Sequence, residues 1–292
     1  MHLTATGRVC VTNIHDSGQS QTVAVTDKLF AGSIPEVYDR YLVPLIFESY
    51  ARDIAERVVQ VEPERVLETA AGTGVLTRAM SSRLPACARI VATDLNQPML
   101  DHAQRISPRD DRVTWRQADA MALPFEDETY DVVACQFGVM FFPDMIRACR
   151  EVYRVLKPGS HFLFNVWDHI LVNDFANVVT QALIKLFQDD PPLFMARTPH
   201  GHHDVGRIKG QLRASGFASI SVETREHKSK APSALDVAIA YCQGTPLRNE
   251  IEARDPSRLE EATHAAADLL ARRFGNRAIE GRIRAHIFSV TR

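Results

Sequence analysis

Short apolar runs alternate with helically spaced segments through the first half of the chain. The runs cover residues 65–68, 89–94, 112–116, 131–137 and 161–166. Runs of this length are typical of buried strands, whereas apolar residues that recur every three to four positions are typical of amphipathic helices. Regular alternation of the two predicts an α/β fold, with helices on both faces of a doubly wound, mostly parallel sheet.

The second half of the chain is less regular. We expect an amphipathic helix over 173–187, then an irregular, histidine-rich loop over 193–206. Strands are predicted over 218–224 and 282–290. The 233–274 stretch between them has mostly helical spacing, broken by a Gly-Thr-Pro sequence.

These segments suggest one domain over residues 28–292, preceded by a polar arm over 1–27. The arm lacks the pattern of a secretory leader, and we interpret it as loosely docked or as a segment over the site. The domain core is expected over 61–170. Substrate-side lid segments are expected over three further ranges, namely 28–60, 171–206 and 231–275.

A glycine turn follows the first predicted strand. Gly72 and Gly74 lie between Glu68, which ends that strand, and a helical pattern that begins at Val75. Glycine lets backbone N–H groups approach a nucleotide-like ligand closely. Asp94 ends the next strand, where a carboxylate can accept the hydroxyl hydrogens of a ribose. The combination fits either a dinucleotide or an adenosyl cofactor.

Three details favour the adenosyl cofactor. Thr77 stands where the dinucleotide fingerprint has its third glycine. Glu68 would repel a pyrophosphate, but it would attract a ligand with a sulfonium and an ammonium group. Asp119 follows the third strand, in a position to accept from an adenine amino group, with the Ala120 N–H beside the ring.

Five stretches then occur in a familiar order, namely ETAAGTG, TDLNQPML, ADAMALPF, YDVVACQFGVMFFPD and REVYRVLKPGSHFLFNVW. Together they resemble the class I S-adenosylmethionine-dependent methyltransferases, especially the ubiquinone/menaquinone branch. The resemblance runs from about Tyr38 to Trp167 and departs at Ala70, where many members have glycine. It implies S-adenosyl-L-methionine as cofactor and a seven-stranded Rossmann-like sheet with an antiparallel last strand. Here a helical insertion or lid separates the last two strands.

The resemblance and the strand ends together predict a cofactor site. Its expected residues are Tyr38, Glu68, Ala70, Gly72, Thr73, Gly74, Asp94, Leu95, Met99, Asp119, Ala120 and Gln136. The resemblance alone places Tyr38 at the methionine end, with Tyr41 as a second candidate; either is otherwise a core or rim aromatic. Met99 either packs on the adenine or is an ordinary core methionine.

The methyl acceptor is expected to bind beside this site. Phe137, Met140 and Phe141 follow the fourth strand, and Phe194 lies in the later loop. An apolar, aromatic lining suits a small, partly hydrophobic acceptor. Attack by carbon, nitrogen or oxygen stays open, because a base is needed only where the acceptor must lose a proton.

The histidine-rich loop allows three interpretations. His200 and His202 are candidates for a general base, and a histidine titrates in the range that suits this role. With His203 and Asp204 they also match the ligand types of a divalent metal. The third interpretation is a solvated loop. Our site prediction names His200 and His202 as candidate bases and includes no metal.

Composition limits the partners. The formal net charge is −2, without a basic excess to attract phosphate backbones, so we expect no nucleic-acid partner. No apolar run is long enough to span a membrane. The five cysteines are odd in number and lack a C-x-x-C spacing, which favours reduced thiols in the cytoplasm. We therefore expect a cytoplasmic protein with a small-molecule acceptor, and a homodimer stays open.

Two other functions stay open at this point. An NAD(P)-dependent Rossmann oxidoreductase shares the glycine turn and Asp94, but it fits poorly with Thr77, Glu68 and the absence of a Tyr-x-x-x-Lys pair in the right place. A non-catalytic module that binds S-adenosylmethionine without transferring methyl also fits, because fold alone does not fix function.

Overall fold

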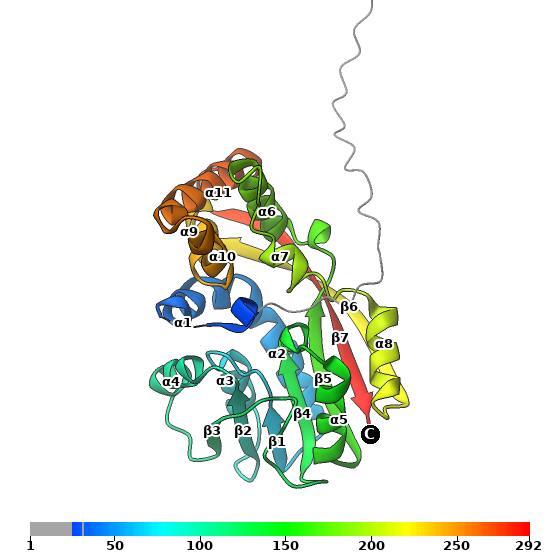
Figure 1. The fold of residues 1–292 in the computed structure, drawn as a ribbon. Helices are drawn as coiled ribbons and strands as arrows, with labels where there is room; N and C mark the ends of the chain where they lie inside the picture. The colour runs from blue at the N-terminus through cyan, green and yellow to red at the C-terminus, as the bar shows by residue number, and fades with distance from the viewer. Residues whose placement is uncertain (1–24, 31) are drawn as a thin grey trace, which may run out of the picture.

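A seven-stranded sheet forms the centre of the protein, which is seen here in a computed structural model that describes residues 25–30 and 32–292 (Figure 1). The strand order is β3-β2-β1-β4-β5-β7-β6. The first five strands are parallel, β7 is antiparallel to β5, and β6 is antiparallel to β7. The strands are β1 (Arg65–Glu68), β2 (Arg89–Asp94), β3 (Val113–Gln117), β4 (Tyr130–Gln136), β5 (Leu156–Trp167), β6 (Ser219–Ala231) and β7 (Ile279–Thr291). The predicted fold class is confirmed.

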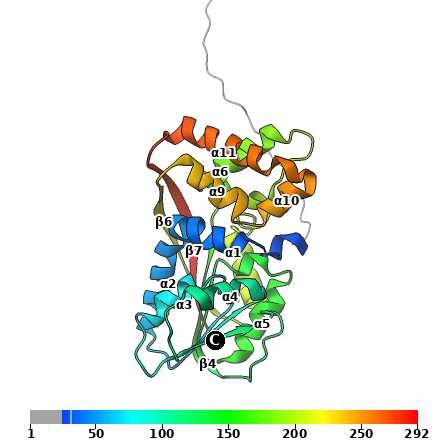
Figure 2. The ribbon, with the colours of Figure 1, turned by 90° about the vertical axis from the view of Figure 1, so that its left-hand side faces the viewer.

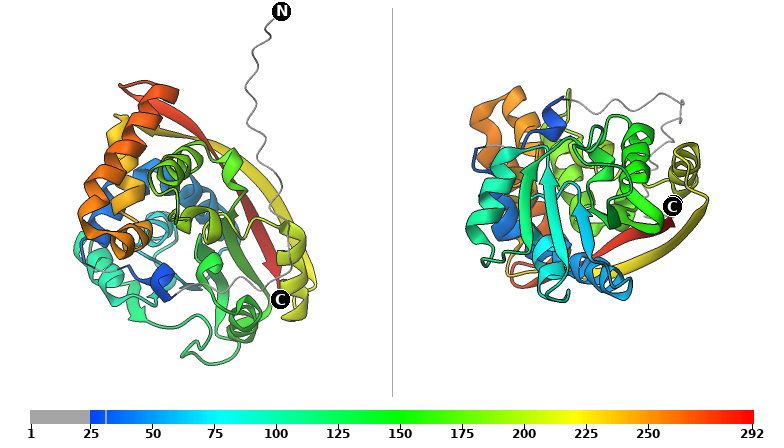
Figure 3. Two further views of the ribbon diagram at one scale, coloured as in Figure 1. Left: turned by 45° about the horizontal axis from the view of Figure 1, so that its top comes forward. Right: turned by 90° about the horizontal axis from the view of Figure 1, so that it is seen from below.

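Helices lie on both faces of the sheet (Figure 3). On one face, α2 (Glu48–Gln60) and α3 (Val75–Ser81) share a buried apolar cluster with β1, β2 and β4. On the other face, α5 (Met145–Val155) packs on β5, and α8 (Val205–Ala214) packs on α5. α4 (Gln97–Ile106) lies beside β2 and β3. Parallel strands covered in this way direct all their carboxyl ends to one edge.

A group of helices, here called the cap, stands over that edge (Figures 1 and 2). Its members are α6 (Asp174–Leu186), α7 (Phe194–Arg197), α9 (Ala234–Gln243), α10 (Leu247–Arg254) and α11 (Leu259–Phe274). Residues 285–291 of β7 pair with β5, whereas residues 279–284 pair with β6 alone and run up to the cap. The long hairpin thus carries the inserted helices above the strand ends.

The described residues before β1 are mostly helical. A 3₁₀ turn, η1 (Val25–Lys28), precedes α1 (Ile34–Val37), the π-helical segment η2 (Tyr38–Phe47) and α2. Pro44 lies inside η2 without ending it. A wide turn of this kind tolerates the missing N–H, and such turns are frequent at functional sites. η2 contributes several side chains to the cavities described below.

Four sequence-based boundaries were wrong. β5 begins at Leu156, directly after α5, instead of at residue 161, and residues 157–160 form an irregularity in its pairing with β4. The predicted loop at 193–206 contains α7 and the start of α8. β6 and β7 extend beyond their predicted ends. The outer half of β6 is polar on both faces, as at Lys228 and Lys230, which hides a strand's apolar period. The outer half of β7 does alternate, with Ile279 and Ile283 buried, and the prediction missed that pattern. The arm over 1–27 stays a prediction, since the structure describes only its last three residues, of which Asp27 is fully buried.

Residues 1–24, including Cys10, lie outside the described part of the chain. The other four cysteines are free thiols, and three of them are buried. Burial raises the pKa of the Cys135 thiol to about 12, which argues against a nucleophile there. No helix of the described residues combines the length and apolarity that crossing a bilayer requires.

Candidate functional site

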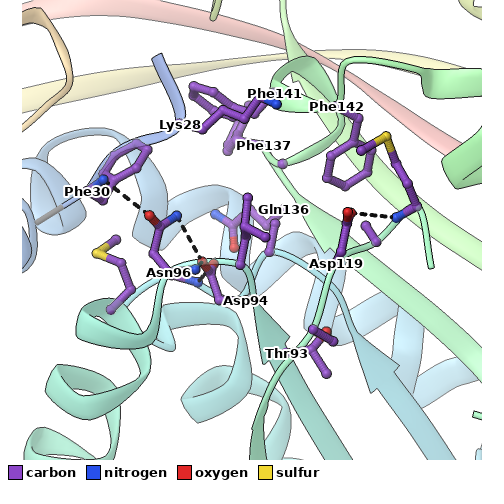
Figure 4. A pocket seen from close by; sticks show the side chains of 18 of the residues that line it. Lys28, Phe30, Thr93, Asp94, Asn96, Asp119, Gln136, Phe137, Phe141 and Phe142 are labelled. Atoms are coloured by element: carbon purple, nitrogen blue, oxygen red, sulfur yellow. Dashed lines mark hydrogen bonds between the residues drawn. The ribbon is translucent and has the colours of Figure 1, made fainter. Parts of the chain in front are cut away.

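Two adjoining cavities open at the carboxyl ends of the parallel strands, beneath the cap. The first, here called the strand-end pocket, has a volume of about 140 Å³ (Figure 4). Its lining includes Lys28, Phe30, Tyr38, Ala70, Gly72, Asp94, Leu95, Asn96, Met99, Asp119, Ala120, Gln136, Phe137 and Phe141. The second, here called the aromatic cavity, lies on the cap side and has a volume of about 50 Å³.

Asp94 connects the glycine turn to the loop after β2. One carboxylate oxygen accepts from the Gly72 N–H at 2.9 Å, and the other accepts from the Asn96 N–H at 2.8 Å. Burial raises the pKa of Asp94, while these hydrogen bonds counteract that rise. The carboxylate is therefore held rigidly at the pocket wall, where the sequence predicted a ribose contact.

Glu68 lies in a small polar recess behind the pocket. Its carboxylate is buried, and Thr77 Oγ1 donates to it at 2.6 Å. Burial raises the pKa of Glu68 to about 8, because the Thr77 hydrogen bond and the Arg78 charge only partly offset the cost of burying the carboxylate. Thr77, where a dinucleotide fingerprint has glycine, is thus the hydrogen-bond partner of this acid. A bound proton neutralises the buried Glu68 carboxylate, and a cation placed in the recess would neutralise it in the same way.

Two oxygen atoms in the lining of the recess have no hydrogen-bond partner in the protein. They are Gln136 Oε1 and Thr73 Oγ1, and both are buried. The Gln136 amide nitrogen donates to the Phe47 carbonyl at 2.9 Å, which fixes the side chain's orientation. Because buried polar atoms are rarely left unpaired, these oxygens and Glu68 fit a ligand that brings an ammonium group. The recess and pocket together therefore suit the amino-acid and nucleoside ends of S-adenosylmethionine.

Most residues of the predicted cofactor site meet at these cavities, with two qualifications. Gly74 does not line them. A Cβ atom there would lie 2.5 Å from the Trp115 ring, so this position must be small to pack against β3. Asp119 lines the pocket, but one of its oxygens accepts from the Met121 N–H at 2.8 Å and closes a turn. Only the other oxygen is left for an adenine contact.

The aromatic cavity brings together the predicted acceptor residues and others that the sequence did not reveal. Phe137, Met140, Phe141 and Phe194 all line it. The unpredicted residues are Phe30, Leu42, Ile46, Phe47, Trp167, Met195, Pro199, Thr245 and Pro246. The Trp167 and Phe137 rings stack with centroids 3.8 Å apart. Trp167 ends β5, so the strand-end reasoning applied to the other strands would have found it, whereas Phe30 carried no such signal.

The histidines of the predicted loop lie elsewhere. His200 is buried, and its Nδ1–H donates to the Asp168 carbonyl at 2.8 Å. Burial lowers the pKa values of His200 and His202 to about 4, because the charged ring is disfavoured. Neither histidine lines either cavity. The solvated-loop interpretation is therefore wrong for His200, and the general-base role stays a prediction that this geometry does not favour.

The metal interpretation of the loop also finds no support. Within residues 25–30 and 32–292, no three His, Cys, Asp or Glu side chains gather in a way that would hold an ion. His203 Nδ1 lies 2.8 Å from the His200 carbonyl, and Asp204 accepts from the Arg207 N–H at the start of α8. Both side chains thus form hydrogen bonds with nearby backbone groups.

Comparison with known proteins decides the family. The pattern described as "Methyltransferase domain" matches residues 67–164. The chain is 32% identical over 172 residues to a demethylmenaquinone methyltransferase of Clavibacter sepedonicus, covering 56% of this chain and 69% of that protein. The chain belongs to the class I S-adenosylmethionine-dependent methyltransferases, in the ubiquinone/menaquinone branch.

Other relatives agree. A ubiquinone/menaquinone biosynthesis C-methyltransferase of Idiomarina loihiensis is 29% identical over 180 residues, covering 54% of this chain and 68% of that protein. The solved structure of the YcgJ protein of Bacillus subtilis has a TM-score of 0.51 at 18% identity, covering 82% of this chain and 98% of that chain, which bears on the fold alone. The protein is therefore an enzyme that transfers methyl from S-adenosylmethionine to a small molecule. The oxidoreductase and non-catalytic alternatives are set aside.

Proposed function

We propose that this methyltransferase acts on a ring carbon of a planar, hydroxylated aromatic acceptor of the hydroquinone type. The observation that carries the proposal is the lining of the aromatic cavity, which within the described residues contains aromatic and other apolar side chains, the hydroxyl groups of Tyr38 and Thr245, and no charged group. Acceptors with an ammonium, carboxylate or phosphate group would be left unpaired there. The relatives named for demethylmenaquinone and for ubiquinone/menaquinone C-methylation support the same acceptor class.

The cofactor end of the site follows from the residues already described. We propose that Asp94 accepts from the ribose hydroxyls, that the backbone around Gly72 allows close approach, and that Glu68, Thr73 and Gln136 receive the cationic amino-acid end. When bound, S-adenosylmethionine supplies an electrophilic methyl group. The protein contributes position, because the acceptor atom must lie close to that methyl and in line with it.

Proton transfer does not require a protein base in this scheme. Among the described residues that line the aromatic cavity, Tyr38 is the only ionisable one, and burial raises the pKa of its phenol far above the usual range. The acceptor's own hydroxyl, once ionised, makes the adjacent ring carbon nucleophilic. The ring-carbon proton then leaves to solvent after the new carbon–carbon bond has formed.

The pH dependence of turnover tests this proposal. With a series of 1,4-dihydroxynaphthalenes that differ in hydroxyl pKa, we expect the apparent pKa of kcat/KM to follow the acceptor's pKa. His200→Asn should leave that dependence unchanged, because His200 Nδ1 binds a backbone carbonyl outside the cavities. An apparent pKa that is the same for all acceptors and disappears in the His200 variant would instead identify a protein base.

We further propose that nucleic acid is not an acceptor, since the formal net charge of −2 offers no general attraction for phosphates. A homodimer stays a prediction that size-exclusion chromatography with light scattering would decide.

A further inference from the structure

The segment of residues 25–30, here called the strap, crosses the junction of the two cavities. Phe30 lines both cavities, together with Tyr38, Phe137 and Phe141. Its ring meets Tyr38 and Phe141 edge-to-face, with centroids 6.1 and 5.9 Å away. Tyr38 and Phe141 belong to helical segments, and Phe137 follows β4 directly and is buried against Trp167, whereas Phe30 lies on an irregular segment (Figure 4). It is therefore the movable part of the shared wall.

A group of charged residues holds the strap in place. Asp27 is fully buried, and its two oxygens accept from Arg197 Nη2 at 2.7 Å and Thr198 Oγ1 at 2.5 Å. The same Arg197 nitrogen donates to Glu250 of α10, whose other oxygen accepts from the Phe194 N–H at 3.1 Å. We call Asp27, Arg197 and Glu250 the clasp. A buried carboxylate is tolerable only when it is paired, so the clasp favours one strap position.

Weaker contacts complete the attachment. The Phe30 N–H donates to Asn96 Oδ1 at 3.4 Å, and Asn249 Nδ2 donates to the Leu29 carbonyl at 3.1 Å. The Leu29 side chain itself is 51% exposed. The strap is thus fixed at Asp27, and within the described part of the chain hydrogen bonds at Leu29 and Phe30 attach the rest of it. Segments with few apolar anchors open at low free-energy cost.

The size of the aromatic cavity shows why the strap matters. At about 50 Å³, it is smaller than the ~150 Å³ cavity that accommodates one benzene ring in an engineered protein core. A hydroquinone acceptor cannot enter without displacement of the lining. Phe137, Pro199, Thr245 and Pro246 of the lining also lie outside helices and strands, but all four are in well-packed turns of the sheet and cap. Phe30 lies on the strap beside the 51% exposed Leu29, so its displacement disturbs little packing.

We propose that Phe30 is a positioning residue for the methyl acceptor, and that the strap leaves the clasp to admit the acceptor and returns to hold it. The proposal rests on the proposed function for the chemical class of the acceptor. The returning Phe30 ring presses on the bound acceptor from the side shared with the cofactor, which sets the distance between the acceptor carbon and the methyl group.

Steady-state kinetics with 1,4-dihydroxynaphthalene, together with calorimetric titration of S-adenosylhomocysteine, tests the role of Phe30. Phe30→Ala should raise the acceptor KM and lower kcat, each by about tenfold, while the affinity for S-adenosylhomocysteine changes by less than about threefold. Phe30→Leu should recover most of the loss. Leu29→Ala is the matched control, since this neighbouring side chain faces solvent. Equal effects of Phe30→Ala and Leu29→Ala, or equal losses for acceptor and S-adenosylhomocysteine, would overturn the proposal.

Trypsin provides a readout that needs no turnover, because Lys28 lies on the strap. Glu250→Gln weakens the clasp and should speed cleavage after Lys28 about tenfold. Glu252→Gln changes the same helix outside the clasp and should not. Equal cleavage rates after Lys28 in the two variants would contradict the proposal that the strap opens by leaving the clasp. If the wild type methylates no hydroquinone, the proposed function fails, whereas the cleavage rates still decide whether the strap opens.

Discussion

Single residues explain why this site favours a cationic cofactor. Glu68, Thr73 and Gln136 present buried side-chain oxygens. Those of Thr73 and Gln136 have no hydrogen-bond partner, and the pKa of Glu68 is raised by burial. The sequence identified all three by position at or near strand ends, but it did not reveal that Thr77 is the partner of Glu68. That contact depends on a side chain one helical turn into α3, and its geometry follows from the fold rather than from the spacing of the motif.

The raised pKa of Glu68 gives a prediction with a definite sign. Between the ordinary value of 4.5 and about 8, the folded state keeps a proton that the unfolded state releases. This contribution to stability therefore falls as the pH rises through that window. Glu68→Gln lacks the titration, so its melting temperature relative to wild type should rise by several degrees from about pH 6 to about pH 9.

Glu68→Gln should also change how the affinity for S-adenosylmethionine depends on pH. Wild-type affinity for S-adenosylmethionine should increase from about pH 6 to about pH 9 as Glu68 ionises, whereas the affinity of Glu68→Gln should be lower and nearly independent of pH over this range. Calorimetry with both proteins measures this. Parallel affinity curves for the two proteins would show that Glu68 does not hold the cation.

At the scale of elements, the glycine turn serves two neighbours at once. Gly72 lines the strand-end pocket and donates its N–H to Asp94, whereas Gly74 faces the Trp115 ring of β3. A sequence motif presents the two glycines as one ligand-binding feature. The different roles of the two glycines could not be seen before the pairing of β2 with β3 was known, because that pairing places Trp115 beside the turn.

Two glycine-to-alanine substitutions at the same φ angle distinguish the cost of backbone strain from the cost of a side-chain collision. Gly74 and Gly159 both have φ of +80°, but a Cβ at Gly159 meets nothing within 4 Å. Gly159→Ala should cost about 1 kcal/mol from the left-handed backbone alone. Gly74→Ala adds the collision with Trp115 and should cost about 3 kcal/mol or more. Urea denaturation at constant pH measures both, and equal losses would contradict the packing role of Gly74.

At the scale of the whole molecule, the parallel half of the sheet follows directly from the sequence, and the cavities do not. Each parallel strand is a local apolar run, so its position can be predicted without knowledge of its neighbours. The aromatic cavity instead combines Phe30, Phe47, Trp167, Phe194 and Pro246, which are far apart in the chain. The cap itself comes from two parts of the chain. Helices α6 and α7 follow β5, and the long β6–β7 hairpin carries α9, α10 and α11, with an outer half of β6 that is too polar to predict as strand.

The identity of the methylated atom tests the central claim most directly. The enzyme would be incubated with 1,4-dihydroxynaphthalene and S-adenosylmethionine labelled in the methyl carbon, and the product would be examined by carbon NMR. We expect one new methyl group bonded to a ring carbon, with both hydroxyl groups intact. An O-methyl product, or no product from an enzyme that binds S-adenosylhomocysteine normally, would contradict the proposed acceptor chemistry.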